Sequence, residues 1–198
     1  LGELVADLPR QALQPGAFPR YGKLMQRQLA LRASYFPEIV GLRIIDAQGN
    51  LLYASDVAEP RANLAERSYF KALRQDPQAR LFFSEVMVGR ISGRTQLVVA
   101  MPIRRADGSF AGVAVAPLDM HYFQQFFDAI DLGPQGAITF RRSDDGRLVL
   151  RRPERPGTVN QTLSNNPMHL RVEAGEREGV ISYRAALDQM ERVYAFKR

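Results

Sequence analysis

The chain of 198 residues contains no cysteine and no tryptophan, and its only histidines are His121 and His169. The absence of cysteine excludes disulfides and thiolate metal sites, and is compatible with a bacterial periplasm or a cytosol. The two histidines are far apart and belong to no HxxxH or HExxH pattern, so we expect no metal site. No apolar run approaches the roughly 18 residues that a membrane span requires, and no signal peptide opens the sequence. We therefore expect the chain to be an excised part of a longer protein.

Motifs of nucleotide binding and nucleophilic catalysis are also missing. The sequence has no GxxxxGK, GxGxxG or GxSxG pattern, which would indicate phosphate loops, dinucleotide sites or serine nucleophiles. Asp144 and Asp145 are adjacent in a predicted turn, so their carboxylates point apart and form no catalytic pair. We predict neither an enzymatic activity nor a cofactor for this chain.

Lysine is scarce among the basic residues. The chain has 27 lysines and arginines against 21 acidic residues, a net charge of +6, and only three of the 27 are lysines. A basic chain can bind nucleic acid when its charges gather on one face beside aromatic residues. Here the arginines are spread from Arg10 to Arg198, and the densest group, within 141–155, surrounds a predicted turn. We predict no nucleic-acid partner.

The composition, 45% hydrophobic and 24% charged, is typical of globular proteins. Three prolines predict an irregular segment over the first twenty residues, and apolar spacing over 21–36 predicts an amphipathic helix. A capping-box pattern at Asn63 predicts a second helix over 64–74, and Asp119 is expected to cap a third. The Asp107-Gly108 pair between two apolar runs predicts a hairpin. The predicted strands of this half are 40–46, 51–54, 83–88, 95–103 and 110–118.

The second half repeats this order of elements. The segment GLRIIDAQGNLLYA over 41–54 has a counterpart in GAITFRRSDDGRLVL over 136–150. Further strands are predicted near 179–185 and 191–197, with a helix near 168–175. The pattern predicts an α+β fold with two antiparallel units in tandem.

Five segments resemble the double Cache, or PDC-like, sensor domains of bacterial membrane receptors. They are Gly49 in the first hairpin, NLAERSYFKAL over 63–73, FSEVMVGRISGR over 83–94, AMPI over 100–103 and DGSFAGVAVAPLD over 107–119. The resemblance is best over 37–130 and looser up to 198. It is closest to the sensors of diguanylate cyclases, with histidine kinases next and chemoreceptors after them.

The resemblance implies two PAS-like units along a long N-terminal helix. On this basis we expect a stalk over 1–37, a membrane-distal ligand-binding unit over 38–130, and a membrane-proximal unit over 131–198 that is truncated at its C-terminus. It also implies a periplasmic location between two transmembrane helices, a cytoplasmic output domain such as GGDEF, and a possible homodimer through the N-terminal helix. A module that binds another periplasmic protein and no small ligand is the alternative.

The resemblance also implies a ligand site in the distal unit. In amino-acid-binding relatives, the arginine of the RSYF stretch holds the ligand carboxylate and the aspartate ending the late strand holds the ammonium; here these are Arg67 and Asp119. Tyr69 stands where those relatives have tryptophan, so a carboxylate or another small polar metabolite is as open as an amino acid. The further candidates are Arg94, Phe83, Ser84 and Met101. Each polar candidate also has an interpretation without a ligand. Arg67 can form a surface ion pair, Asp119 can only cap a helix, and Arg94 can be a solvent-exposed residue of a hairpin.

Overall fold

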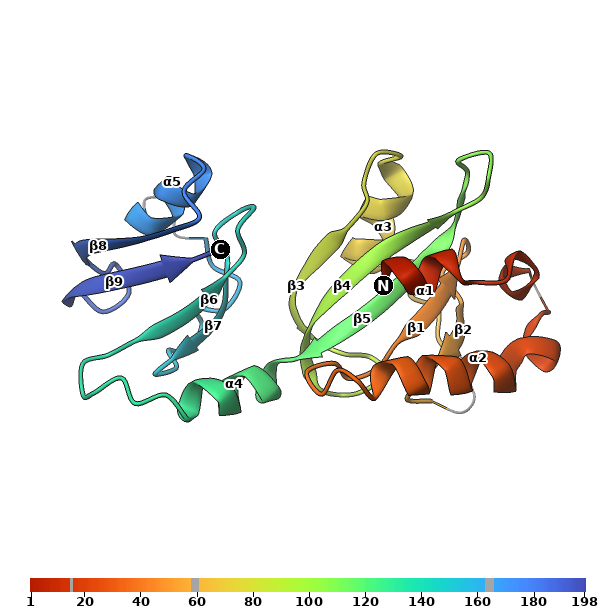
Figure 1. The fold of residues 1–198 in the computed structure, drawn as a ribbon, viewed down its shortest axis with the longest axis horizontal. Helices are drawn as coiled ribbons and strands as arrows, with labels where there is room; N and C mark the ends of the chain where they lie inside the picture. Colours follow the sequence, from red (N-terminus) through yellow and green to blue (C-terminus); the bar gives the residue numbers. More distant parts are fainter. Residues whose placement is uncertain (15, 58–60, 163–165) are drawn as a thin grey trace. The chain divides into compact units, whose positions relative to one another are not determined.

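The computed structural model describes residues 1–14, 16–57, 61–162 and 166–198. Its contacts divide the chain into two compact units, Leu1–Phe123 (unit 1) and Gln124–Arg198 (unit 2). Each unit has its own antiparallel strands and helices, which are labelled in Figure 1. The predicted α+β class with antiparallel sheets is confirmed. The segment 1–37 belongs to unit 1, and the division falls within helix α4 (Met120–Asp128).

Unit 1 is built on a five-stranded sheet with the strand order β2-β1-β5-β4-β3. The strands are β1 (Arg43–Asp46), β2 (Leu51–Ala54), β3 (Phe82–Val88), β4 (Thr95–Arg104) and β5 (Phe110–Asp119). Every neighbouring pair is antiparallel, and the β4–β5 hairpin turns at Gly108 with φ +82°. Gly112 lies at φ +149°, where an added Cβ would stand 2.1 Å from the Ile45 carbonyl oxygen. Glycine at this position thus allows β5 to pair closely with β1.

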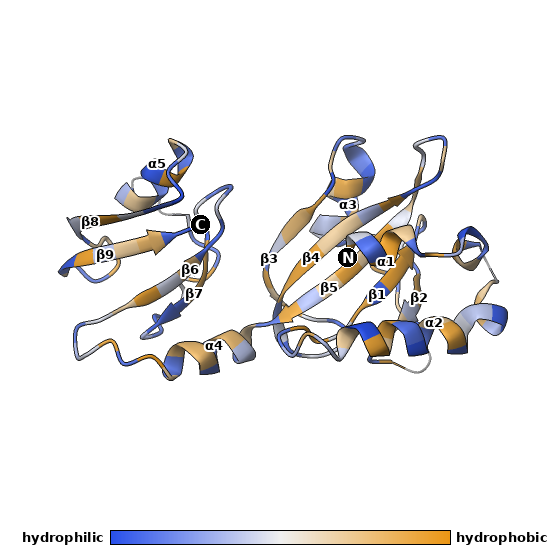
Figure 2. Cartoon of the chain, in the orientation of Figure 1, coloured by the Kyte–Doolittle hydropathy of each residue, from blue (hydrophilic) through white to orange (hydrophobic). Residues whose placement is uncertain are grey.

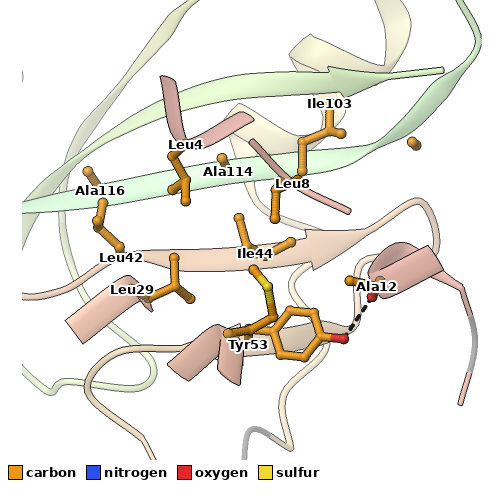
Figure 3. Close-up of a cluster of buried hydrophobic side chains, with 12 residues drawn as sticks. Leu4, Leu8, Ala12, Leu29, Leu42, Ile44, Tyr53, Ile103, Ala114 and Ala116 are labelled. Carbon is orange, nitrogen blue, oxygen red and sulfur yellow. Dashed lines mark hydrogen bonds between the residues drawn. The ribbon is translucent and has the colours of Figure 1, made fainter. Parts of the chain in front are cut away.

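Both faces of this sheet are covered by apolar clusters, and Figure 2 shows mainly hydrophobic residues along the central strands β4 and β5. One face packs against the N-terminal helices through a cluster that includes Met25, Leu29 and Ile44, drawn in Figure 3. There the buried Tyr53 hydroxyl donates to the Ala12 carbonyl oxygen at 2.8 Å. The other face packs against α3 (Ser68–Gln75) through a second cluster that includes Phe70. Because side chains alternate along a strand, each residue of β4 and β5 belongs to one face only.

The N-terminal segment is more ordered than the sequence predicts. Residues expected to be irregular form α1 (Gly2–Ala6) and the 3₁₀ turn η1 (Arg10–Leu13), ahead of α2 (Phe18–Ala33). Pro9 and Pro19 do not prevent this, because Pro9 precedes the first residue of η1 and Pro19 lies in the first turn of α2, where the missing N–H costs nothing. The prediction of irregular structure was wrong here.

Helix α3 begins four residues later than its predicted start. Asn63 does not cap it: its side-chain oxygen accepts from the Ala65 N–H, and its amide donates to the Gln48 carbonyl and the Asn50 side chain. These bonds hold the loop before α3 against the β1–β2 turn. The residue at the N-cap of the helix is Arg67, and this places its side chain at the end of α3 rather than along it.

Unit 2 contains two separate antiparallel hairpins among its described residues. One joins β6 (Ile138–Arg141) to β7 (Leu148–Arg152), the other joins β8 (Glu178–Arg184) to β9 (Glu191–Lys197), and α5 (Pro167–Glu173) precedes the second. Asn166 caps α5 by accepting from two backbone N–H groups. Asp188 links the hairpins through ion pairs of 2.7 Å with Arg151 and 2.9 Å with Arg192. The strands predicted for this half are all present, within a few residues of their expected bounds.

Candidate ligand-binding site

Helix α3 presents Arg67 and Tyr69 at its N-terminal end. Tyr69 is only 4% exposed and lies with Phe70 and Leu73 on the helix face that packs on the sheet. Burial raises the pKa of Tyr69 to about 12, an effect that the nearby Arg67 and Arg43 guanidinium groups oppose. The hydroxyl of Tyr69 is therefore protonated at neutral pH and can donate a hydrogen bond.

A small cavity lies between this end of α3 and the sheet. Arg67 and Tyr69 line it together with Arg43 of β1, Met87 of β3 and Gln96 of β4. Its volume is about 10 Å³, room for about one water molecule. Arg67 contacts the Met87 sulfur at 3.5 Å through Nη1. The cavity is thus a narrow space bounded by polar groups on both the helix and the sheet.

Arg43 and Gln96 were not among the predicted site residues. Arg43 is 3% exposed and donates two hydrogen bonds to the Asp56 carboxylate, at 2.5 and 3.1 Å. Gln96 is also buried, and its side-chain oxygen accepts from the Ser92 hydroxyl at 2.9 Å. Arginine inside the apolar run VGLRII was the available signal, because a charged residue in a buried strand is uncommon without a partner or a function.

The charges around the cavity favour an anion. Three guanidinium groups, those of Arg43, Arg67 and Arg90, lie near Tyr69, against the carboxylates of Asp56 and Glu66. Glu66 is shared: its Oε1 lies 2.8 Å from Arg90 Nη2 and 3.4 Å from Arg67 Nε. Among these five groups one positive charge is left over, and a carboxylate matches the planar donor fork of a guanidinium.

Asp119 and Arg94 are brought together at the end of β5. Arg94 Nη1 lies 2.8 Å from Asp119 Oδ2, and Asp119 Oδ1 accepts from the backbone N–H of His121 at 3.0 Å. Asp119 pairs with Gln96 in the β4–β5 register and therefore faces the α3 side of the sheet. Its carboxylate is 11% exposed, whereas the Arg94 side chain is 62% exposed. Asp119 thus caps α4 and also binds Arg94, whose long side chain reaches the carboxylate from the solvent side.

Phe83 and Met101 lie on the opposite face of the sheet from the cavity. Met101 pairs with Ala114, which belongs to the cluster beneath the N-terminal helices. Phe83 pairs with Val99, and the next residue along the strand, Ala100, belongs to the α3 cluster on the other face. Alternation along the strands turns both side chains away from α3, so neither lines the cavity with Arg67.

Ser84 is fully buried in β3, at an irregularity of the β3–β4 register. Its hydroxyl accepts from the Val98 N–H at 2.9 Å and donates to the Glu85 carbonyl at 2.7 Å. Ser84 therefore replaces ladder hydrogen bonds that the bulged strand loses.

The chain matches the family model described as Cache domain over residues 4–198. The chain belongs to the Cache domain family. As a Cache domain it is a ligand-binding sensor module rather than a catalytic one, and the five-stranded antiparallel sheet of unit 1 agrees with this family. No protein of curated function matches the chain by sequence comparison. Within the part of the chain that the structure describes, no helix is long and apolar enough to cross a membrane.

Solved structures similar to this Cache domain are extracellular or sensor domains of receptors. The extracellular domain of rpHK1S-Z16, a predicted histidine kinase, is 28% identical with a TM-score of 0.73, over 91% of this chain and 73% of that chain. The sensor domain of the V. cholerae histidine kinase DctB is 16% identical with a TM-score of 0.56, over 98% and 77%. The ligand-binding domain of the Pseudomonas aeruginosa amino-acid chemoreceptor PctC, solved with GABA, is 20% identical with a TM-score of 0.56, over 92% and 75%.

Proposed function

We propose that this Cache domain is the periplasmic sensor of a bacterial transmembrane signalling protein, and that unit 1 binds a small carboxylate-bearing metabolite. The observation that carries the proposal is the group of Arg67, Tyr69 and Arg43 around one cavity with an excess positive charge. Arg67 would hold the carboxylate, and the protonated Tyr69 hydroxyl would donate a further hydrogen bond. The ligand must enlarge the cavity as it enters, since the space present holds only about one water.

The output domain of the full-length protein is part of the same proposal. The sequence resemblance favours a diguanylate cyclase with a GGDEF domain, and the similar structures favour a histidine kinase or a chemoreceptor. All three arrangements place the sensor between two transmembrane helices. In each, binding acts only through a difference in affinity between two receptor states.

Asp119 decides between two ligand classes. If the ligand carries an ammonium group, as GABA does in the PctC structure, that group must compete with Arg94 for the Asp119 carboxylate. Replacing Arg94 with alanine should then strengthen amino-acid binding. For a ligand without an amine, the same replacement should leave binding unchanged or weaken it.

Isothermal titration with amino acids, GABA and dicarboxylates tests the site. Arg67→Ala should lower the affinity for a carboxylate ligand by about 2–5 kcal/mol when the contact is desolvated. Arg74→Ala is the matched control, because Arg74 is an exposed arginine in the last turn of the same helix. Equal binding to the wild type, Arg67→Ala and Arg74→Ala would show that Arg67 does not hold the ligand.

A further inference from the structure

Unit 2 contains a cavity of about 440 Å³ that the sensor site in unit 1 does not explain. It lies among β6, α5 and the end of β9, the elements labelled in Figure 1. Its volume falls within the range of small-molecule sites. The described residues that line it include Arg141, Arg142, Lys197 and Arg198 but no aspartate or glutamate. Arg142 is paired with Asp144 and Asp145, and Lys197 Nζ lies 3.8 Å from the Glu178 carboxylate, so these two charges are compensated. No carboxylate of the described residues pairs with Arg141.

Arg141 is the unusual group in this wall. Its Nη1 donates to the Gly146 carbonyl at 3.0 Å, whereas its Nε is buried and has no hydrogen-bond partner among the described residues. Burial lowers the pKa of the Arg141 guanidinium, and the positive charge of Arg151 acts in the same direction. Arg151 itself is compensated by the Asp188 carboxylate at 2.7 Å. An unpaired buried N–H costs free energy, so Arg141 is poised for an acceptor.

The two units can be compared at this position because their first hairpins share one register. After a bulge, Ile45 pairs with Leu51 in unit 1, and Arg141 pairs with Leu148 in unit 2. Ile45 is fully buried in the cluster beneath α3. A guanidinium thus stands where the equivalent strand of unit 1 has a core isoleucine. Packing alone would favour the isoleucine, since even a partly buried cation without a counterion gains little from leaving water.

We propose that this cavity binds a small aliphatic carboxylate, with Arg141 as its anchor. The free Nε–H and the adjacent Nη2 form the side of the guanidinium that can donate two parallel hydrogen bonds to a carboxylate. Because the Nε is buried, the Arg141 side chain must turn toward the cavity as the ligand binds. Met168, Val172 and Phe196 supply apolar contacts for a short hydrocarbon chain. His169 lines the same space, and its Nε2 lies 3.2 Å from the Glu173 carboxylate. All of these residues belong to unit 2, so this proposal does not depend on the ligand site proposed for unit 1.

Nuclear magnetic resonance of the arginine Nε–H groups tests the anchor in the 198-residue chain. Butyrate is the probe, with butyramide as its neutral counterpart and inorganic phosphate as a second anion. We expect one buried Nε–H signal, absent from the Arg141→Met spectrum, to shift saturably with butyrate and not with butyramide. The Arg184→Met variant, which removes an exposed arginine of β8, should bind butyrate like the wild type.

A second measurement separates a binding role from a structural one. Removing a partly buried cation that no carboxylate of the described residues compensates should leave the melting temperature of the unliganded protein unchanged or raise it, while binding falls at least tenfold. If Arg141→Met lowers the melting temperature sharply, Arg141→Lys is tested in its place. Lysine keeps the positive charge but cannot donate two parallel hydrogen bonds, so a tenfold loss of butyrate affinity is still expected. The proposal is overturned if butyrate moves no Nε–H signal, or if phosphate binds as tightly as butyrate. Arg67→Ala should leave butyrate binding in unit 2 intact, so this test is separate from that of unit 1.

Discussion

Two ion pairs of unit 1 have the same closest distance but different burial, and they should differ greatly in their contribution to stability. Arg43 and Asp56 approach to 2.5 Å with side chains 4% and 19% exposed, and Arg32 and Asp7 approach to 2.5 Å with side chains 35% and 64% exposed. An exposed pair contributes about 0–1 kcal/mol. Removing one partner of a buried pair costs about 3–5 kcal/mol, because the remaining charge is left without compensation.

We therefore expect Asp56→Ala to lower the free energy of unfolding by about 3 kcal/mol, the lower end of that range, because water reaches part of the carboxylate. Asp7→Ala should cost less than about 1 kcal/mol. The Arg43–Asp56 pair should also be asymmetric. Arg43→Met leaves the partly exposed Asp56 carboxylate, which water can solvate, so it should cost less than half as much as Asp56→Ala.

Urea unfolding followed through the amide signals of β1 and β5 measures these changes in unit 1 alone. This readout is preferred because the chain has no tryptophan and its two units can unfold separately. The slope of the free energy with urea should stay constant across the variants. Losses for Asp56→Ala and Asp7→Ala that agree within about 0.5 kcal/mol would refute the argument that burial, rather than distance, sets the energy of these pairs.

Three further outcomes follow from other parts of the chain. The pKa of Tyr69 is about 12 in the fold and near 10 in the unfolded chain, so the unfolded state loses that proton first as the pH rises. The free energy of unfolding should therefore fall between pH 10 and pH 12. Absorbance titration at 295 nm should show an ionisation in the wild type that is missing from Tyr69→Phe. Leu24 and Leu31 are 52% and 61% exposed on one face of α2 and should contact a second copy if the sensor dimerises through this helix. Leu31→Glu should then shift the sedimenting species from dimer to monomer. A wild type that is monomeric at all concentrations contradicts this. Amide hydrogens of β4 and β5 should exchange more slowly than those of β8 and β9, because the first pair is central in a sheet covered on both faces and the second pair is half exposed; slower exchange in β8 and β9 would contradict this.

The order of elements could be predicted because turn chemistry and strand periodicity are local. Asp107 and Gly108 indicated the β4–β5 hairpin, and the apolar runs on each side gave the bounds of its two strands to within one residue. The start of α3 was mispredicted because Asn63 forms the hydrogen bonds of a cap, but with a loop rather than a helix. Helix α1 has only five residues, too few for a period of 3.6 to be visible.

The site was predicted less completely, because the faces of a strand depend on what covers them. Phe82 and Phe83 are both apolar, so alternation alone could not say which of them faces α3. Met101 lies in a strand that is covered on both sides, where apolar residues occur on both faces. The sequence therefore does not indicate which face its side chain occupies. Arg43 becomes a site residue only when β1 is placed beside β5 and beneath Tyr69, which is a tertiary arrangement.

Asp119 connects the proposed ligand chemistry with the helix that follows it. It ends β5 beside Gln96, pairs with Arg94, and accepts the His121 N–H in the first turn of α4. A capping interaction of this kind contributes about 1 kcal/mol to its helix. A ligand that rearranges the hydrogen bonds of this carboxylate would therefore alter the first turn of α4 directly. Since a change of 1.4 kcal/mol alters an equilibrium constant tenfold, this one contact is large enough to bias a receptor between two states.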